Sequence, residues 1–197
     1  MSRPQLSEQE LRLEAERFVK YRGTVRVRLE VLHSQWNEPR GLSRKNVEML
    51  KEIFQGEKRS YGNIRRLDPR NHILPVVERS NLGNAILASE ISLSNPDTRN
   101  MLKFAAGYRL TCLHGRYRNR AAREILLPTD AWWTVDLYLT DADPELRATL
   151  VEEYSNEEKP SDREIYRKIQ QYEREGNFCF KKRWKTHLSD NGRRSLR

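Results

Sequence analysis

The stretch Leu113-His-Gly-Arg-Tyr-Arg-Asn-Arg-Ala-Ala-Arg-Glu124 joins a predicted strand to a predicted helix. The strand-like run 108–113 leads to the single glycine Gly115, and good helix formers follow it. A glycine turn that opens onto a helix exposes backbone N–H groups and the positive end of the helix dipole. Arg116, Arg118 and Arg120 add forked cationic donors, so the stretch predicts a phosphate site. The alternative is an amphipathic basic helix with solvated arginines.

Hydrophobic spacing predicts a small α+β domain around this junction. Helices are expected at residues 6–22, 43–54, 116–126, 144–154 and 161–175, with a short helix at 97–106. Residues 80–94 are ambiguous, and a helix is favoured around 85–91. Strands are expected at 24–32, 73–78, 108–113 and 132–139. This order indicates a small mixed sheet with surrounding helices.

Charge is distributed unevenly along the chain. The formal net charge is +9, and residues 99–123 carry seven Lys or Arg and no acid. Residues 181–197 carry seven basic residues and one acid, whereas residues 129–164 carry eleven acids and three bases. Basic segments favour a polyanion, such as a nucleotide, a nucleic acid or an acidic lipid. The alternative is pairing between acidic and basic segments, and the basic end by itself predicts a flexible, solvated tail.

Composition excludes several classes of protein. No run of about 18 apolar residues is present, so we expect no transmembrane helix and no membrane partner. Residues 1–16 carry four glutamates and do not resemble a signal peptide. Two cysteines cannot build a disulfide framework, which favours an intracellular place, cytoplasmic or nuclear. The predicted organisation is a helical extension at 1–23, a domain at 24–176 and a basic tail at 177–197.

Five motifs follow one another along the chain: Pro39-Arg40, the helix 43–54 with Gly56, Ile73-Leu-Pro-Val-Val-Glu78, Gly115-Arg-Tyr-Arg-Asn-Arg-Ala-Ala122, and Leu150-Val-Glu-Glu-Tyr-Ser-Asn-Glu157. In this order they resemble the N-terminal domain shared by ParB-type chromosome partition proteins and sulfiredoxin. The likeness covers about residues 25–176. The chain also resembles a fungal family known only as a domain of unknown function, at Ala131-Trp-Trp-Thr-Val-Asp-Leu-Tyr138 and Glu152-Glu-Tyr-Ser-Asn156.

The resemblance implies a nucleotide site. This domain binds a cytidine nucleotide with magnesium in the partition proteins and ATP in sulfiredoxin. Gly115 then corresponds to the turn glycine, Arg118 and Arg120 to arginines near the phosphates, and Glu152 to a glutamate near Mg²⁺ and the triphosphate. The neighbouring residues His114 and Arg116 are candidates for further phosphate contacts, and Glu153 for a further metal ligand. The alternatives are a polar residue at the end of a strand for His114 and a solvated helix end for Glu152 and Glu153.

The chain departs from the family pattern at several positions. The family glutamate after the glycine is Arg116 here, and the next arginine is Tyr117. The last motif has Glu153, Ser155 and Asn156 in place of its Asn, Gln and Arg. Tyr117 also stands where sulfiredoxin has its catalytic cysteine, so sulfinic-acid reductase activity is not expected.

The remaining candidate residues point to structural roles or leave two roles open. Cys112 reads as a small buried hydrophobe, and the four histidines have no metal-ligand spacing with the cysteines. Core packing is favoured over a base-stacking platform for Trp132 and Trp133. Trp184, within a basic run, fits base stacking and a helix anchor equally well.

The leading hypothesis is a domain that binds a nucleoside triphosphate with Mg²⁺ and is at most a weak nucleoside triphosphatase. We expect alanine at Arg118 to weaken nucleotide binding without unfolding the domain. The alternatives are a non-enzymatic nucleic-acid-associated protein that uses the basic segments, and a scaffold without a ligand. The sequence does not define the oligomeric state.

Overall fold

The computed structural model describes residues 8–34, 43–55, 66–91, 101–153, 162–186 and 188. The chain divides into two compact units, Met1–Glu157 and Glu158–Arg197. The division falls before the helix at 162–174, whereas the sequence places that helix inside the main domain.

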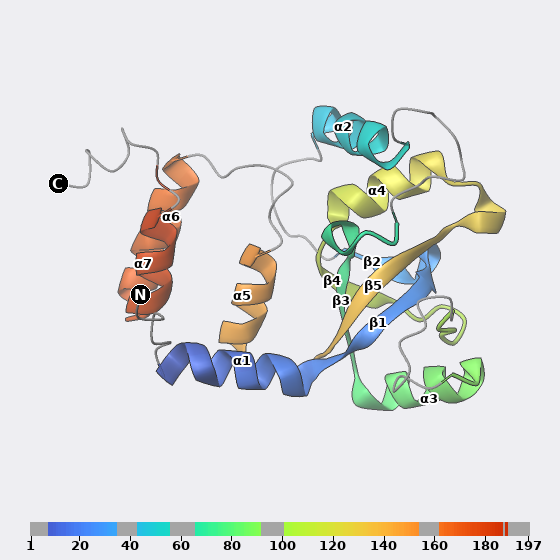
Figure 1. Cartoon of the computed structure of the whole chain (residues 1–197), viewed down its shortest axis with the longest axis horizontal. Coiled ribbons are helices and arrows are strands. Elements are labelled where there is room, and N and C mark those ends of the chain that lie inside the picture. The colour runs from blue at the N-terminus through green and yellow to red at the C-terminus, as the bar shows by residue number, and fades with distance from the viewer. Residues whose placement is uncertain are drawn as a thin grey trace, which may run out of the picture. The chain divides into compact units, whose positions relative to one another are not determined.

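The first unit is built on a mixed sheet with the strand order β1-β5-β3-β4-β2 (Figure 1). β1 pairs with β5 and β3 with β4 in antiparallel fashion, whereas β3 with β5 and β2 with β4 are parallel. The predicted α+β class with a small mixed sheet is confirmed. The strands are β1 Tyr21–Arg28, β2 Leu32–His33, β3 Leu74–Val77, β4 Leu110–His114 and β5 Trp132–Leu139.

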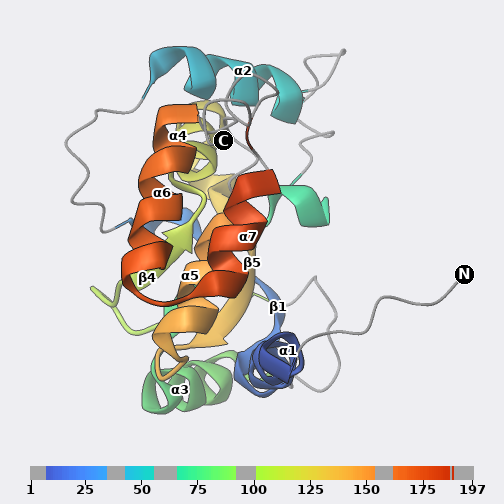
Figure 2. The same cartoon turned by 90° about the vertical axis from the view of Figure 1, so that its left-hand side faces the viewer.

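Helices surround this sheet. In both views α2 lies beside α4, and residues of the two helices are in contact (Figures 1 and 2). The helices of the first unit are α1 Glu8–Lys20, α2 Arg44–Gln55, α3 Arg79–Ser89, α4 Arg116–Ile125 and α5 Pro144–Glu153, and those of the second unit are α6 Asp162–Arg174 and α7 Phe178–Thr186. Short 3-10 turns occupy Leu29–Val31, Pro69–Asn71 and Pro128–Asp130.

Every second side chain of β5 points into the hydrophobic core of the first unit. Trp133, Val135 and Leu137 belong to one buried hydrophobic cluster, and the Trp133 ring lies 4.8 Å from that of Phe54 on α2. Trp132, one residue earlier, stands between the guanidinium groups of Arg26 and Arg66, at 4.3 and 3.6 Å. Core packing is therefore the role of Trp133, and cation–π contact that of Trp132.

Two sequence predictions of secondary structure are wrong. The predicted strand 24–32 is interrupted by the 3-10 turn Leu29–Val31, and its parts form β1 and β2 at opposite edges of the sheet. Alternating hydrophobicity gave no sign of this break, because the apolar residues Val25, Val27, Leu29 and Val31 keep the same spacing into the 3-10 turn. The predicted helix 97–106 is absent over 101–106, where Leu102 N–H instead donates to Arg26 O at 2.8 Å. Residues 97–100 lie outside the described part.

The second unit is a pair of packed helices. Gly176, with φ +70°, lies in the turn between α6 and α7. The rings of Tyr172 and Phe180 lie 5.1 Å apart, and Trp184 is 9% exposed. Trp184 is thus a helix anchor, and the predicted solvated tail is wrong for residues 178–186. Ser161, the predicted cap of α6, lies outside the described residues.

Within the described ranges, none of the helices combines the length and the apolar character that crossing a membrane requires.

Candidate functional site

Gly115 forms the turn between β4 and α4, and two separate constraints require a glycine there. Its φ of +96° lies in the left-handed region, which L side chains rarely adopt. A Cβ at this position would lie 2.8 Å from Cγ1 of Ile73, the residue just before β3. The glycine therefore allows both the turn and the close approach of α4 to the sheet, as the sequence predicted for a strand–glycine–helix junction.

The start of α4 has the features of an anion site. No side chain caps the helix at Gly115, and its first turn contains no acid. Backbone N–H groups of a first helical turn have no partner within the helix, and the helix dipole makes this end positive. Arg116, the first helical residue, adds a guanidinium whose Nη2 lies 3.4 Å from the Tyr117 hydroxyl.

The start of α2 lies close to the start of α4. Ser43, the residue before α2, donates its backbone N–H to the Tyr117 hydroxyl at 3.3 Å. The first turn of α2 also contains no acid and begins with Arg44. Tyr117 therefore links the residue before α2 to the first turn of α4, whereas the Arg44 side chain is paired with Glu48 and Glu124.

Arg118 is buried, unlike the solvated or ligand-binding arginine that the sequence predicts. Its side chain is 4% exposed, and Nη1 donates to the carbonyl of His72 at 3.0 Å and to Nδ1 of His114 at 3.3 Å. Because a guanidinium only donates, Nδ1 of His114 accepts and the imidazole is neutral. Burial and the Arg118 charge lower the pKa of His114 to about 3.

The burial of Arg118 corrects the expectation that alanine there leaves the fold intact. Removal of the guanidinium would leave two buried acceptors without their donor. Arg118 and His114 are buried and support the turn. Neither is an exposed phosphate ligand in this structure.

Arg120 points away from the predicted phosphate contacts and toward the far end of α4. Its Nε donates to Glu124 at 2.8 Å, and the same carboxylate is paired with Arg44 and Lys51 of α2. Hydrogen bonds from these three cations, that of Arg44 first, lower the pKa of Glu124 to about 2. This network fixes α2 against α4.

The predicted magnesium ligands lie on α5. Glu152 is partly buried and engaged within the structure, and the side chain of Glu153 falls outside the described part. Among the described residues, no three His, Cys, Asp or Glu side chains gather as a metal site. Magnesium binding by Glu152 and Glu153 therefore stays a prediction, since Mg²⁺ can be held by one or two carboxylates together with substrate phosphates.

Residues 20–156 match the family described as protein of unknown function (DUF3723), N-terminal domain. The chain belongs to this family. The DUF3723 match covers the whole sheet, the β4–α4 turn and α5, and it excludes the second unit. No curated protein and no solved structure matches the chain.

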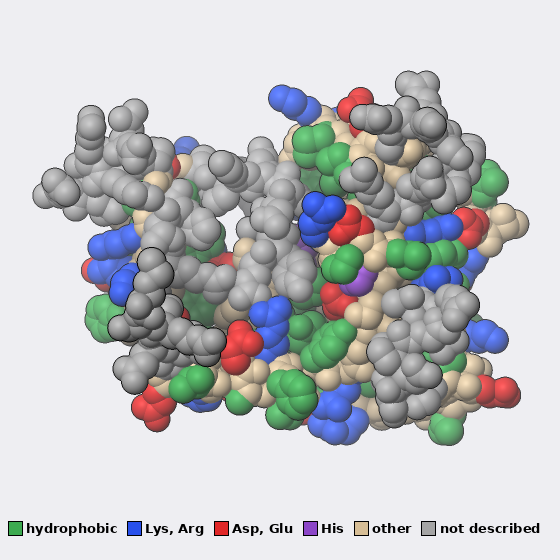
Figure 3. Space-filling model, in the orientation of Figure 1, with side chains coloured by type: hydrophobic (Ala, Val, Ile, Leu, Met, Phe, Trp, Pro, Cys, Tyr) green, Lys and Arg blue, Asp and Glu red, His purple; other side chains and the backbone are tan. Residues whose placement is uncertain are grey.

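Other residues singled out in this DUF3723 chain have structural roles. Cys112 is buried, and burial raises the pKa of its thiol to about 12, so it is no nucleophile near neutral pH. Trp184 is enclosed in the second unit and is not available for base stacking. On the face shown in Figure 3, side chains of both charges are interspersed over the described residues.

Sequence reasoning missed a polar cluster around β5. His72 Nδ1 lies 3.1 Å from both carboxylate oxygens of Asp136, and the Thr24 hydroxyl donates to Asp136 Oδ1 at 2.5 Å. His72 has no metal-ligand spacing in the sequence, and spacing alone does not predict its contact with Asp136. The available signal was the polar alternation of Thr134 and Asp136 within an otherwise apolar strand.

Proposed function

We propose that the first unit binds a nucleoside triphosphate through its phosphates at the start of α4. The observation that carries this proposal is the Gly115 turn, which opens α4 with no side-chain cap and no acid in the first turn. A phosphate there would accept hydrogen bonds from first-turn N–H groups and interact with the positive end of the helix dipole.

Charge around the turn supports the proposal. Arg116 supplies an arginine at the first helical position, and Arg118 places a buried cation within the same turn. The start of α2 is linked to the turn through the Ser43–Tyr117 hydrogen bond, but its Arg44 is already paired with Glu48 and Glu124. Arg116 is the expected direct ligand, Arg118 and His114 are positioning residues, and the proposal covers binding alone.

A thermal-shift panel with ATP, CTP, GTP and UTP, each with and without Mg²⁺, tests the proposal. Inorganic tripolyphosphate is the probe for recognition of the phosphates without a base. A ligand that binds only the folded protein stabilises it by about 2.7 kcal/mol at 100 times its Kd. A rise in melting temperature with tripolyphosphate and at least one nucleotide is expected.

The variant Arg116→Ala tests whether the phosphates bind at the start of α4. Loss of one charged hydrogen-bond donor is expected to weaken affinity about tenfold, because such a bond contributes about 1.5 kcal/mol. Arg79→Ala is the matched control, since Arg79 also opens a helix after a strand but follows Glu78. Unchanged affinity in Arg116→Ala, or no shift with any probe, would contradict the proposal.

A further inference from the structure

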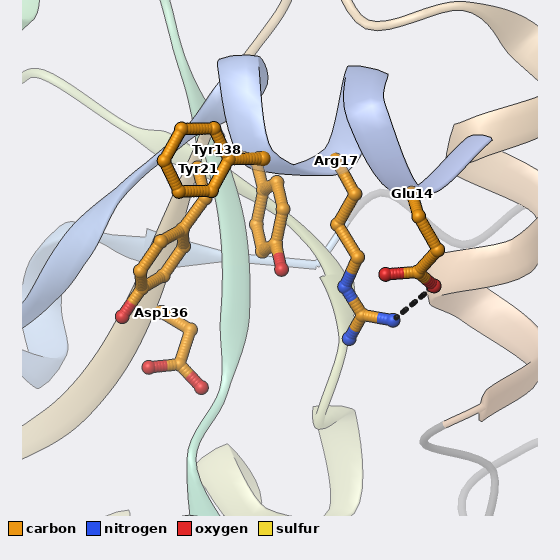
Figure 4. Close-up of a pocket in the computed structure, with 6 residues that line it drawn as sticks. Glu14, Arg17, Tyr21, Asp136 and Tyr138 are labelled. Carbon is orange, nitrogen blue, oxygen red and sulfur yellow. Dashed lines mark ion pairs between the residues drawn. The ribbon is translucent and has the colours of Figure 1, made fainter. Parts of the chain in front are cut away.

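A pocket of about 320 Å³ lies where α1, β1 and β5 meet (Figure 4). It contains none of the residues of the α4 turn. Figure 4 shows Asp136 and the two tyrosines on one side and Arg17 with Glu14 on the other. The lining residues are Glu14, Arg17, Phe18, Tyr21, Asp136 and Tyr138.

The Asp136 carboxylate is held in a fixed position in this pocket. The buried His72 and the Thr24 hydroxyl both approach it within hydrogen-bond distance. Because the ionised carboxylate only accepts, Nδ1 of His72 carries the proton of that bond. Tyr21 in turn lies 2.7 Å from the Thr24 hydroxyl and donates to it.

Asp136 can accept further hydrogen bonds from a ligand. A carboxylate has about four acceptor sites, and the donors Thr24 and His72 use only some of them. Its side chain is 14% exposed. A carboxylate oriented in advance in this way binds a donor at a lower entropic cost than a mobile surface carboxylate.

The rest of the pocket favours a cation. Arg17 and Glu14 form an ion pair at 3.9 Å, so their charges offset each other and Asp136 leaves the pocket negative. The Tyr21 and Tyr138 rings are 5.4 Å apart and tilted by 51°. Aromatic faces next to a carboxylate attract ammonium and guanidinium groups through both cation–π and charge–charge interactions.

We propose that this pocket binds an ammonium or guanidinium group carried on an aliphatic stem. The charged group donates to Asp136, and the stem packs against the tyrosine rings. Two sources share this chemistry: a lysine or arginine side chain of a partner polypeptide, and a small free amine.

The surface of α1 beside the pocket offers a place for a polypeptide. Leu11, Ala15, Phe18 and Val19 lie on one face of α1 and are all exposed, with Phe18 84% exposed at the pocket. The opposite face of α1 packs on the domain, where Leu13 is buried and Lys20 pairs with Asp141. An apolar residue next to the bound lysine or arginine would cover this exposed face.

Titration with n-butylguanidinium, n-butylammonium and n-butyrate, followed by backbone amide chemical shifts, tests the proposal. The two cations are expected to shift the amides of Tyr21, Asp136 and Tyr138, and butyrate is not. The variant Asp136→Asn is expected to lose at least tenfold in affinity for both cations. Glu52→Gln, which removes an exposed carboxylate on α2 outside the pocket, is the matched control and retains binding.

Two further measurements complete the test. Glu14→Gln, at an exposed position, weakens cation binding without touching the His72–Asp136 contact, so the proposal stays testable if Asp136→Asn unfolds. An acetylated Leu-Lys-Leu amide that binds more tightly than butylammonium assigns the pocket to a polypeptide, and equal affinity assigns it to a free amine. Binding of butyrate as tight as that of the cations, or no loss in a folded Asp136→Asn or in Glu14→Gln, overturns the proposal.

Discussion

Two strand-to-helix junctions in this protein have the same layout and opposite chemistry. β3 leads through Glu78 into α3, and β4 leads through Gly115 into α4. Each helix begins with an arginine, Arg79 or Arg116. At the first junction the backbone before the helix is extended and carries a carboxylate, whereas at the second it is left-handed and carries no side chain.

We expect this difference of one residue to decide which of the two helix starts can accept an anion. The Glu78 carboxylate lies at the positive end of α3, where it accepts from Asn81 Nδ2 at 2.9 Å, so a phosphate would meet a like charge. At Gly115 no acid is present, and the backbone can approach a ligand closely. Whether an arginine at the first helical position indicates an anion site therefore depends on the residue that precedes it.

The largest expected effect comes from Gly115→Ala. The left-handed φ and the contact with Ile73 together cost about 3 kcal/mol of folding free energy. Urea unfolding measures the loss. Gly83→Ala, inside α3 with nothing near the added Cβ, is the control and is expected to gain about 0.5–1 kcal/mol. Equal changes in unfolding free energy for the two variants would show that the β4–α4 junction does not require a glycine.

Arg118→Ala is expected to have the next largest effect, a loss of about 2 kcal/mol, because the His72 carbonyl and His114 lose a buried donor. The exposed Arg120→Ala is the control and should change stability by less than about 0.5 kcal/mol. Chemical denaturation of both variants at neutral pH checks this difference. Comparable stability of the two variants would show that Arg118 does not support the turn.

The smallest expected effect concerns the end of α4 farthest from the turn. Glu124→Gln is expected to lose about 1 kcal/mol above pH 4.5, because it weakens the ion-pair network with α2. The pKa of Glu124 falls from 4.5 to about 2 on folding, so the native protein loses this contribution as the pH falls from 4.5 toward 2. The stability gap between the two proteins should therefore close over that range.

Denaturation at several pH values measures this gap, with Glu52→Gln on the exposed side of α2 as the control. A gap that stays constant down to pH 2 would contradict the assigned pKa of Glu124.

Patterns of adjacent residues predicted much of the fold. The 3.6-residue spacing gave α2, α4, α5 and α6 within a few residues, and the glycine after a strand gave the β4–α4 turn. The same patterns failed where distant contacts decide the conformation. The 24–32 segment divides because its two parts pair with strands far along the chain.

The sequence by itself determined the α+β class, the glycine turn and the arginines that follow it, because these depend on local spacing and backbone freedom. Only the tertiary structure decided which arginine is buried: Arg118 is enclosed by His72, which lies 46 residues away, and Arg120 is drawn to α2 through Glu124. The tertiary structure alone also brings Thr24, His72 and Asp136 together. Burial and charge pairing depend on which segments meet, and local sequence does not encode that choice.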